Sequence, residues 1–452
     1  MTVTINGTTG ITSPGGDTGA ADFTINGLTV GKGAGSVSTN TALGASSLGS
    51  NGAGFLNTAV GSSSLTNNTS GNYNTAVGTN SLLANSSGAA NTALGVQALN
   101  SNTTASNNTA VGYQAGYSNT TGTESTYVGY QAGYYSNGSY NTGVGAYTFA
   151  DVSNSGGYNS AFGRSALQKN SSGSYNTAIG MQALTANTTA SNNTAVGYQA
   201  LYTQSTGGPN TAVGYQSLYY VTSGSNNTSV GYQSLTNVNT GSANNGFGNN
   251  AGGSITSGTN NVTIGASGGA AITSGSYNIC IGSNAGANGL NYTVGTYGTI
   301  VGTYSDFSAN NTDHETVIGA GVTGKGSQKA FIGGTSGAYN GANTTTWATT
   351  SDQRIKKNIV SIDGSLSKIL ALNPVEFDYK ENDKHEVGFI AQEFETVFPD
   401  QIIHHAPTKA EKEMIGDDTE VMGIQQNLVP YLVKAIQELK AEVDSLKQQL
   451  GK

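Results

Sequence analysis

A short phrase in which polar and apolar residues alternate recurs along most of the chain. "NNTAVGYQA" at 107–115 returns at 192–200, and shorter relatives include "NTAVGTNSL" at 74–82 and "NTAVGYQSL" at 210–218. The side chains of Thr-Ala-Val alternate as in a strand, so alanine and valine face opposite sides. The following glycine permits a turn with positive φ, and the Asn, Ser, Thr and Gly residues between phrases favour a second turn. One phrase therefore predicts two short strands and two turns.

The glycines that end the phrases define a fixed period. Every interval between them is 17 residues, except the two beside position 145, which are 16 and 18 and cancel. A fixed period near 20 residues is typical of a solenoid. Fifteen coils, each rising roughly 4.8 Å, predict a shaft of about 70 Å. The glycines stand at positions 44, 61, 78, 95, 112, 129, 145, 163, 180, 197, 214, 231, 248, 265 and 282.

Each period contains little apolar material, typically pairs such as Val60 and Leu65 or Val196 and Leu201. Ordering the backbone costs roughly 1–2 kcal/mol per residue, so a lone coil cannot be stable. Stacked coils can share backbone hydrogen bonds and an inner column, which we expect to consist of Val and Leu. Alanine would then face outward, where its small side chain lets another backbone approach. We therefore expect several solenoids to pack around one axis, with three as the favoured number.

Other residues of the repeat point to structural roles. The tyrosines that follow the turn glycine are expected to stack in outward ladders, with a carbohydrate-binding strip as the alternative. Cys280 replaces an aliphatic residue of the repeat and is expected to be a small buried side chain. Calcium-binding repeats would need an Asp in each turn, so no metal is expected in the shaft. These tyrosines are Tyr113, Tyr130, Tyr198, Tyr215 and Tyr232.

Charge divides the chain into two parts. Residues 1–350 contain 12 charged side chains and a net charge of −2, whereas 351–452 contain 30 and a net charge of −6. Neither part offers the basic surface that nucleic acid binding needs. The start of the chain lacks the features of a secretory signal, and no run of about 18 apolar residues predicts membrane insertion. A single cysteine excludes a disulfide framework.

The period loosens after Gly282, and charge reappears near the end of the shaft. Asp306, Asp313, His314 and Glu315 could hold a metal or act as general acid and base, but a solvated loop is the favoured interpretation. Because exceptions in a repeat are where sites arise, 286–350 is predicted to be an irregular β tip and a candidate receptor-binding region.

The last hundred residues lack the repeat and are rich in charged residues. They contain three motifs in order: "SDQRIKKN" at 351–358, "HEVGFIAQEFETVFPD" at 385–400 and "MGIQQNLVPYLVKAIQELKAEVDSLKQQL" at 422–450. This region resembles the C-terminal intramolecular chaperone of phage endosialidases and tail fibres, which is also an autoprocessing serine peptidase. The shaft phrases are similar to the "NTAVG" arrays of phage and cyanophage tail fibres, and more distantly to the heads of trimeric adhesins. The resemblance implies a domain that trimerises the chains, sets their register and is then cut away.

The resemblance also implies a cleavage site, the bond between Thr350 and Ser351. Ser351 would be the nucleophile and Lys356 the base that takes its proton. A lysine can do so only if burial or positive neighbours such as Arg354 lower its pKa, and Asp352 would orient the loop. Such an enzyme cleaves itself once, with no external substrate and no cofactor. The alternative is that "SDQRIKKN" is a polar helix cap and a solvated loop.

The end of the chain has the spacing of a coiled coil over about 430–450. Its apolar residues are separated by 4, 3, 4, 3 and 4 positions. Ile and Val at a with Leu at d would by themselves favour two strands, so the remaining chain must decide the number of strands. The residues are Leu432, Ile436, Leu439, Val443, Leu446 and Leu450.

The predicted fold is mainly β: an elongated trimeric β-solenoid shaft over 31–285, the tip over 286–350, and a small α+β chaperone domain over 351–452. Residues 1–30 would join a virion tail protein. The predicted function is a phage tail fibre, made in the host cytoplasm, whose homotrimer binds a host surface receptor, either a polysaccharide or an outer-membrane component. The alternatives are a trimeric cell-surface adhesin and a polysaccharide depolymerase tailspike.

Overall fold

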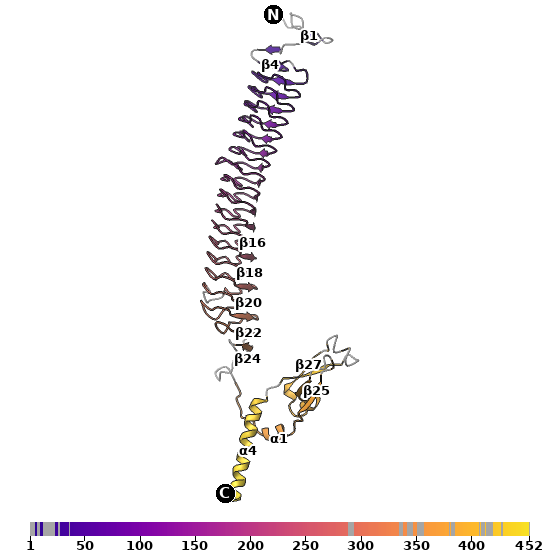
Figure 1. Cartoon of the computed structure of the whole chain (residues 1–452), viewed down its shortest axis with the longest axis vertical. Coiled ribbons are helices and arrows are strands. Elements are labelled where there is room, and N and C mark those ends of the chain that lie inside the picture. Colours follow the sequence, from indigo (N-terminus) through magenta and orange to yellow (C-terminus); the bar gives the residue numbers. More distant parts are fainter. Residues whose placement is uncertain are drawn as a thin grey trace. The chain divides into compact units, whose positions relative to one another are not determined.

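The computed structural model divides the chain into two compact units, Met1–Thr350 and Ser351–Lys452 (Figure 1). From residue 30 onward it describes the chain except for 36, 288–292, 334–337, 341–346, 350–356, 379, 381–384, 406, 408–411, 413–418, 426–427 and 452; before residue 30 it describes only 5–6, 10–11, 23–25 and 28–29.

The first unit is a β-solenoid in which strands β5 to β22 pair in parallel, each with the strand one coil further on. The register repeats the sequence period: Thr194 pairs with Thr211 and Ala195 with Ala212. Their bounds are β5 Thr41–Leu43, β6 Thr58–Val60, β7 Thr75–Val77, β8 Thr92–Leu94, β9 Thr109–Val111, β10 Thr126–Val128, β11 Thr142–Val144, β12 Ser160–Phe162, β13 Thr177–Ile179, β14 Thr194–Val196, β15 Thr211–Val213, β16 Thr228–Val230, β17 Asn245–Phe247, β18 Val262–Ile264, β19 Ile279–Ile281, β20 Thr299–Val301, β21 Thr316–Ile318 and β22 Ala330–Ile332.

In most coils the inner column of the solenoid consists of alanine and leucine, whereas larger side chains such as Ile300 and Val317 take the alanine position near its end. Ala59 and Ala195, at the centre of their strands, are fully buried together with Leu65 and Leu201. The residue before the turn glycine points outward instead, and Ile179 is 42% exposed. The predicted alternation is thus present. The leucine part of the predicted inner column is confirmed, but the valine part is wrong, because the central alanine of the strand lies inside and the residue after it lies outside. The aliphatic residues form an outward row along the strands.

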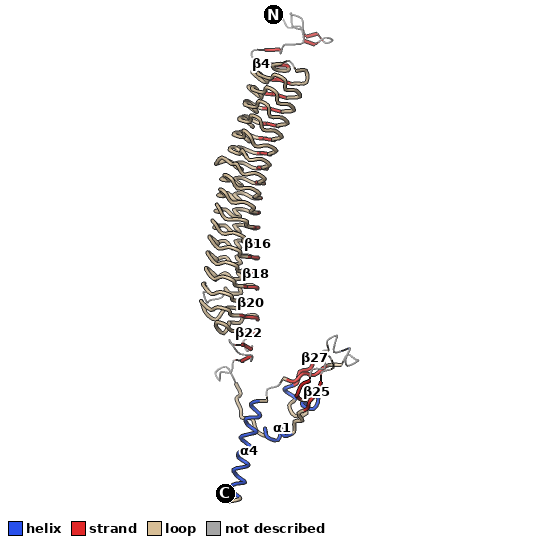
Figure 2. Tube along the Cα trace, in the orientation of Figure 1, coloured by secondary structure: helices blue, strands red, loops and turns tan. Residues whose placement is uncertain are grey.

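Within the described residues, each coil contains one three-residue strand, and turns and bends make up most of the remaining coil (Figure 2). The prediction of two strands per period is therefore wrong, since the segment after the glycine bends too sharply for a second strand. Leu65 has φ 53° within that segment. The glycine is required because of both conformation and space: Gly197 has φ +134°, and an added Cβ would lie 2.4 Å from the carbonyl oxygen of Gly214.

A ladder of buried asparagines runs through the solenoid, where the sequence had suggested only turn residues. The backbone N–H of Asn193 donates to Oδ1 of Asn176 at 3.0 Å, and Nδ2 of Asn176 donates to the carbonyl of Ala190 at 2.9 Å. The ladder satisfies backbone groups that the single strand leaves unpaired in each coil. Its members are Asn40, Asn57, Asn74, Asn91, Asn108, Ser125, Asn141, Asn159, Asn176, Asn193, Asn210, Asn227, Asn244, Asn261 and Asn278.

Antiparallel strands lie at both ends of the stack. β3 (Phe23–Ile25) and β4 (Leu28–Gly31) precede β5, to which β4 pairs antiparallel. β23 (Ala338–Asn340) and β24 (Trp347–Thr349) follow β22 in the same manner. A separate pair, β1 (Ile5–Asn6) and β2 (Gly10–Ile11), lies near the start of the chain.

The second unit is a small α+β region that ends in a helix. Among its described residues, no helix is both long and apolar enough to cross a membrane, and the same holds for the first unit. The fold class predicted from the sequence, a long β-solenoid followed by a small α+β region, is confirmed. The elements are α1 (Ser365–Leu370), β25 (Val375–Asp378), β26 (His385–Gly388), α2 (Ala391–Glu395), η2 (Pro399–Gln401), β27 (Ile402–His405), β28 (Val421–Ile424) and α4 (Val429–Gln449).

Candidate functional site

The boundary between the two units falls at the bond that the sequence analysis assigned to self-cleavage. The first unit ends at Thr350, and the second begins at Ser351. The predicted catalytic and supporting residues lie outside the described residues, so their roles stay predictions. They are Thr350, Ser351, Asp352, Arg354 and Lys356.

Contacts between α1 and α4 hold the beginning and the end of the second unit together. The backbone N–H of Leu366, in the first turn of α1, donates to a carboxylate oxygen of Glu438 on α4 at 2.8 Å. Nζ of Lys434 lies 3.5 Å from Oδ1 of Asp363. Because these partners are about 70 residues apart in sequence, the contacts join the segment around Asp363 and Leu366 to the C-terminal helix.

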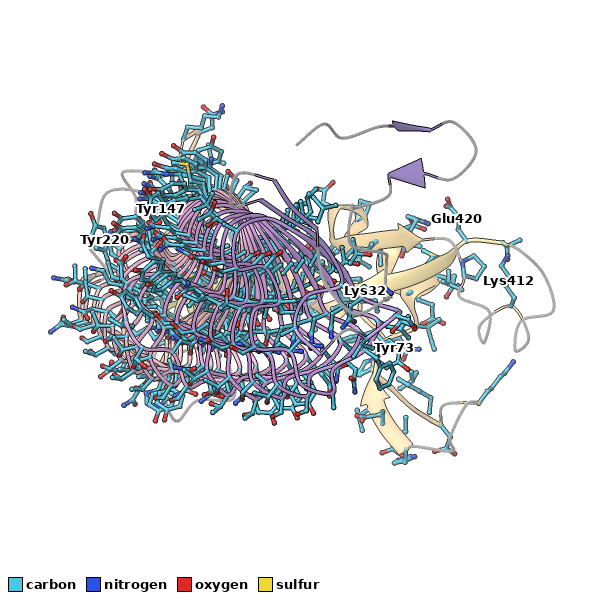
Figure 3. All side chains as sticks on the ribbon, turned by 90° about the horizontal axis from the view of Figure 1, so that it is seen from above. Lys32, Tyr73, Tyr147, Tyr220, Lys412 and Glu420 are labelled. Atoms are coloured by element: carbon cyan, nitrogen blue, oxygen red, sulfur yellow. The ribbon has the colours of Figure 1, made fainter. Side chains whose placement is uncertain are left out.

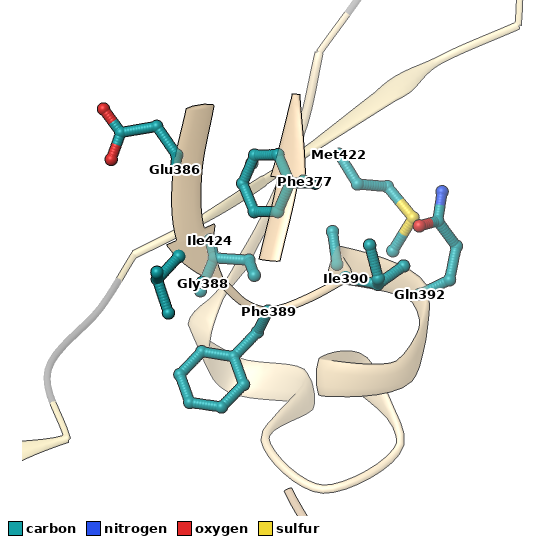
Figure 4. Close-up of a pocket in the computed structure, with 11 residues that line it drawn as sticks. Phe377, Glu386, Gly388, Phe389, Ile390, Gln392, Met422 and Ile424 are labelled. Carbon is teal, nitrogen blue, oxygen red and sulfur yellow. The ribbon is translucent and has the colours of Figure 1, made fainter. Parts of the chain in front are cut away.

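A pocket of about 600 Å³ lies beside the strand β26, and the motif "GFIAQ" of 388–392 lines one side of it (Figure 4). Phe377 and Met422 contribute apolar surface from β25 and β28, and Glu386 lies at the rim. Among the described residues that line this pocket, none is a serine, lysine or histidine. Sequence reasoning missed this pocket, although the recurring apolar residues of the motif were a signal.

The predicted coiled-coil residues lie on α4 and at its end, and they are exposed in the single chain. The exposed fraction is 66% at Ile436 and 48% at Leu439. An exposed apolar row of this kind is typical of an interaction surface. The other members of the row, Leu432, Val443, Leu446 and Leu450, are exposed as well.

The charged residues near the end of the shaft are held by polar contacts of the shaft itself. Glu315 is buried and accepts hydrogen bonds from the hydroxyl of Thr312 at 2.9 Å and from the backbone N–H of Gly326 at 2.6 Å. His314 stacks on Tyr297 at 4.7 Å. Hydrogen bonds from the backbone and side chain of Thr296 lower the pKa of Asp313. Among the described residues, no three His, Cys, Asp or Glu side chains gather as metal ligands.

The tyrosines that follow the turn glycines form the predicted outward ladders. Tyr198 stacks on Tyr215 at 5.3 Å and Tyr215 on Tyr232 at 4.9 Å, with nearly parallel rings. Tyr113 and Tyr130 stack in the same way at 5.3 Å. Further tyrosines, which the sequence analysis did not single out, extend from the turns as well.

Comparison with known proteins concerns the second unit. Residues 351–403 match a family, Peptidase_S74, described as the chaperone of endosialidase. The match begins at Ser351 and includes both the "SDQRIKKN" and the "EVGFIAQ" motifs. Neither the curated proteins nor the solved structures contain a significant match to the chain. A β-solenoid followed by a region similar to this chaperone family fits a tail-fibre-like protein.

Proposed function

We propose that the chain is a phage tail fibre protein that acts as a homotrimer and attaches the virion to a receptor on the host surface. Its second unit would align the three chains during assembly and then be released by cleavage between Thr350 and Ser351. The observation that carries the proposal is a coincidence of boundaries. The similarity to the endosialidase chaperone begins at Ser351, and the second compact unit begins at the same residue.

Trimer formation is supported by the outward face of the strands. That face has aliphatic or aromatic residues at the third position of each strand, with no charged side chain at any strand position from β5 to β21. Leu94 is 47% exposed, Phe162 40% and Ile332 43%. Such a contiguous apolar row marks an interaction surface. We assign it to two further copies of the chain, since a row repeated on every coil fits an identical shaft at the same level.

Alignment by a separate domain is supported by the regularity of the shaft. Chains that slip by one coil would still bring aliphatic residues together, so the repeat specifies its register only weakly. Non-local β assembly is also slow and exposes apolar surface during folding. The exposed apolar row of α4 could align three chains at one fixed level before the shafts associate along their length.

Cleavage is tested by mass spectrometry of the purified chain. We expect a fragment that ends at Thr350, and Ser351→Ala should abolish it. Lys356→Arg keeps the positive charge but removes a group that can accept a proton near neutral pH, so it should also block cleavage. Ser361→Ala changes an exposed serine of the same segment and should cleave normally.

Two outcomes would contradict the peptidase part of the proposal: an intact parent chain after prolonged incubation, or normal cleavage of the Ser351→Ala chain. Detection of the chain in purified virions tests the tail-fibre assignment against the adhesin. Incubation with host envelope polysaccharide, followed by sizing of the products, tests the depolymerase alternative.

A further inference from the structure

A cluster of tyrosines occurs twice on the shaft, 85 residues apart. This distance is five periods of 17, so the two clusters occupy equivalent positions on the coils. Tyr147 lies one period after Tyr130 of the first cluster, and the two rings are 5.4 Å apart. Figure 3, which looks along the shaft, shows Tyr147 on the same side as Tyr220 of the second cluster, away from Tyr73. The first cluster contains Tyr113, Tyr117, Tyr130, Tyr134 and Tyr135, and the second contains Tyr198, Tyr202, Tyr215, Tyr219 and Tyr220.

One tyrosine of each cluster departs from the ladder geometry. Tyr202 and Tyr219 stack face to face, with an interplanar angle of 10°. Tyr220 stands edge-on to Tyr219, at 4.6 Å and 75°, and Tyr135 repeats this arrangement with Tyr134, at 4.5 Å and 76°. The residues one coil before and after Tyr220 are Thr203 and Asn237, which have no aromatic ring that could continue a stack on Tyr220. Tyr220 is 50% exposed.

Tyr220 lines a groove of about 480 Å³ on the side of the shaft, within the size range of small-molecule sites. The other lining residues carry only hydroxyl or amide groups. No Asp, Glu, Lys, Arg or His occurs anywhere between Lys169 and Asp306. The groove is therefore uncharged, and so are the coils above and below it. Its lining consists of Thr203, Tyr220, Thr222, Asn237, Asn239, Ser254 and Thr256.

The polar side chains of the groove are held in place by the coils beneath them. The hydroxyl of Thr203 donates to the carbonyl of Tyr219 at 2.9 Å or of Val221 at 3.0 Å. Nδ2 of Asn237 donates to the carbonyl of Gly253 at 2.6 Å. Buried aliphatic residues such as Val238 lie between the two lining rows, inside the coil. A side chain fixed in this way loses little further freedom when a ligand binds.

We propose that this groove binds a neutral saccharide chain of the host surface. An exposed tyrosine ring offers an apolar face to the C–H side of a sugar ring. Hydroxyl and amide groups can both donate and accept hydrogen bonds, as sugar hydroxyls require. These groups recur on successive coils, roughly 4.8 Å apart, so the saccharide would run along the shaft. An anionic polysaccharide would find no positive charge here. The inference deepens the receptor-binding part of the proposed function and rests on it.

The test measures binding of neutral oligosaccharides of glucose, mannose and galactose to the full chain by titration calorimetry, with an oligomer of sialic acid as the anionic comparison. Tyr220→Ala should weaken binding of the neutral ligand about tenfold or more, whereas Tyr220→Phe should retain most of it. Alanine occurs at the equivalent position of other coils, such as Ala84 and Ala186, so the Tyr220→Ala chain should fold.

Tyr158 supplies a matched control. Tyr158 is 52% exposed, but the rings of Tyr140 and Tyr175 stack on it, with ring centroids 4.6 Å and 5.0 Å away. Tyr158→Ala should therefore leave binding unchanged. The proposal is overturned if no neutral oligosaccharide binds, if both alanine variants lose the same affinity, or if the sialic acid oligomer binds as tightly. Cleavage and sedimentation of the same preparations report separately on the proposed function, so either can fail without the other.

Discussion

Tyr127 occupies the space that a leucine fills in other coils, and Gly133 makes that space available. Tyr127 stands where β10 would have its central alanine, and it is fully buried. An added Cβ at Gly133 would lie 2.3 Å from Cδ1 of Tyr127. Gly133 holds the position that is Leu82 or Leu99 elsewhere. The core of this coil is thus repacked with nearly constant volume.

Replacing Tyr127 and Gly133 by the alanine and leucine of other coils tests this compensation. Tyr127→Ala should lower the free energy of unfolding by about 3–5 kcal/mol, the range for removing a buried aromatic side chain. It would also remove the hydrogen bond from the Tyr127 hydroxyl to Ser136. Adding Gly133→Leu should restore part of the loss, because Leu99 adopts a similar backbone, with φ 47°. Gly133→Leu alone should be strongly destabilising. Additive effects in denaturant unfolding would contradict direct compensation.

The asparagine ladder should be sensitive to single substitutions. Asn176→Ala removes the acceptor of the Asn193 backbone N–H and the donor to the Ala190 carbonyl. Each buried polar group left unpaired costs about 1–3 kcal/mol. Asn176→Ser should lose less, since Ser125 occupies the same row in another coil. Asn249→Ala, on an exposed residue, is the control in thermal unfolding. Equal melting temperatures for the Asn176→Ala and Asn249→Ala chains would show that the ladder contributes little.

Cys280 should be unreactive in the folded chain. Burial raises the pKa of its thiol from 9.0 to about 12, with a smaller contribution from the negative charge of Asp306. The thiol therefore stays protonated at pH 8, and alkylation by iodoacetamide should require unfolding. Because the folded chain keeps the proton that the unfolded chain loses, this residue should lower stability as pH rises from about 9 to about 12. Rapid alkylation under native conditions would contradict the burial.

Charge on the strand face should disrupt the proposed trimer. Val230 ends β16 and is 36% exposed, and Phe247 ends β17. Glutamate at both positions would place carboxylates of three chains close together, so we expect dissociation in sedimentation velocity. Val152→Glu is the control, because Val152 is equally exposed but lies on a bend outside the strand row. If the double variant sediments like the parent chain, the strand face is not the trimer interface.

A chain that ends at Thr350 should not align correctly. Without the second unit, the repeat alone must set the register, and slipped arrangements differ little in energy. A cysteine introduced at Val230 reports alignment, because matched chains bring identical positions to the same level and can be crosslinked. The full chain should crosslink efficiently and the shortened chain poorly. Equal crosslinking in both would remove the need for an aligning domain.

The sequence predicted the parts of the fold that depend on local chemistry. The spacing of the glycines determined the solenoid and its period, because the backbone can turn and approach the next coil only where a side chain is missing. The tyrosine ladders followed from the same period, since residues one period apart stack directly above one another. The break in charge at 351 separated the two units, and the spacing of Leu439, Val443 and Leu446 determined a helix with an apolar row.

Only the tertiary structure decided which side of each strand is inside. Alternation places Ala195 and Val196 on opposite faces, but both are apolar, and neither sequence nor period distinguishes them. The decision depends on what fills the opposite wall of the coil, where Leu201 and the Asn193 row leave a space the size of a methyl group. The sequence likewise did not predict the edge-on ring of Tyr220 or its groove, because both form between coils that come together only when the solenoid stacks.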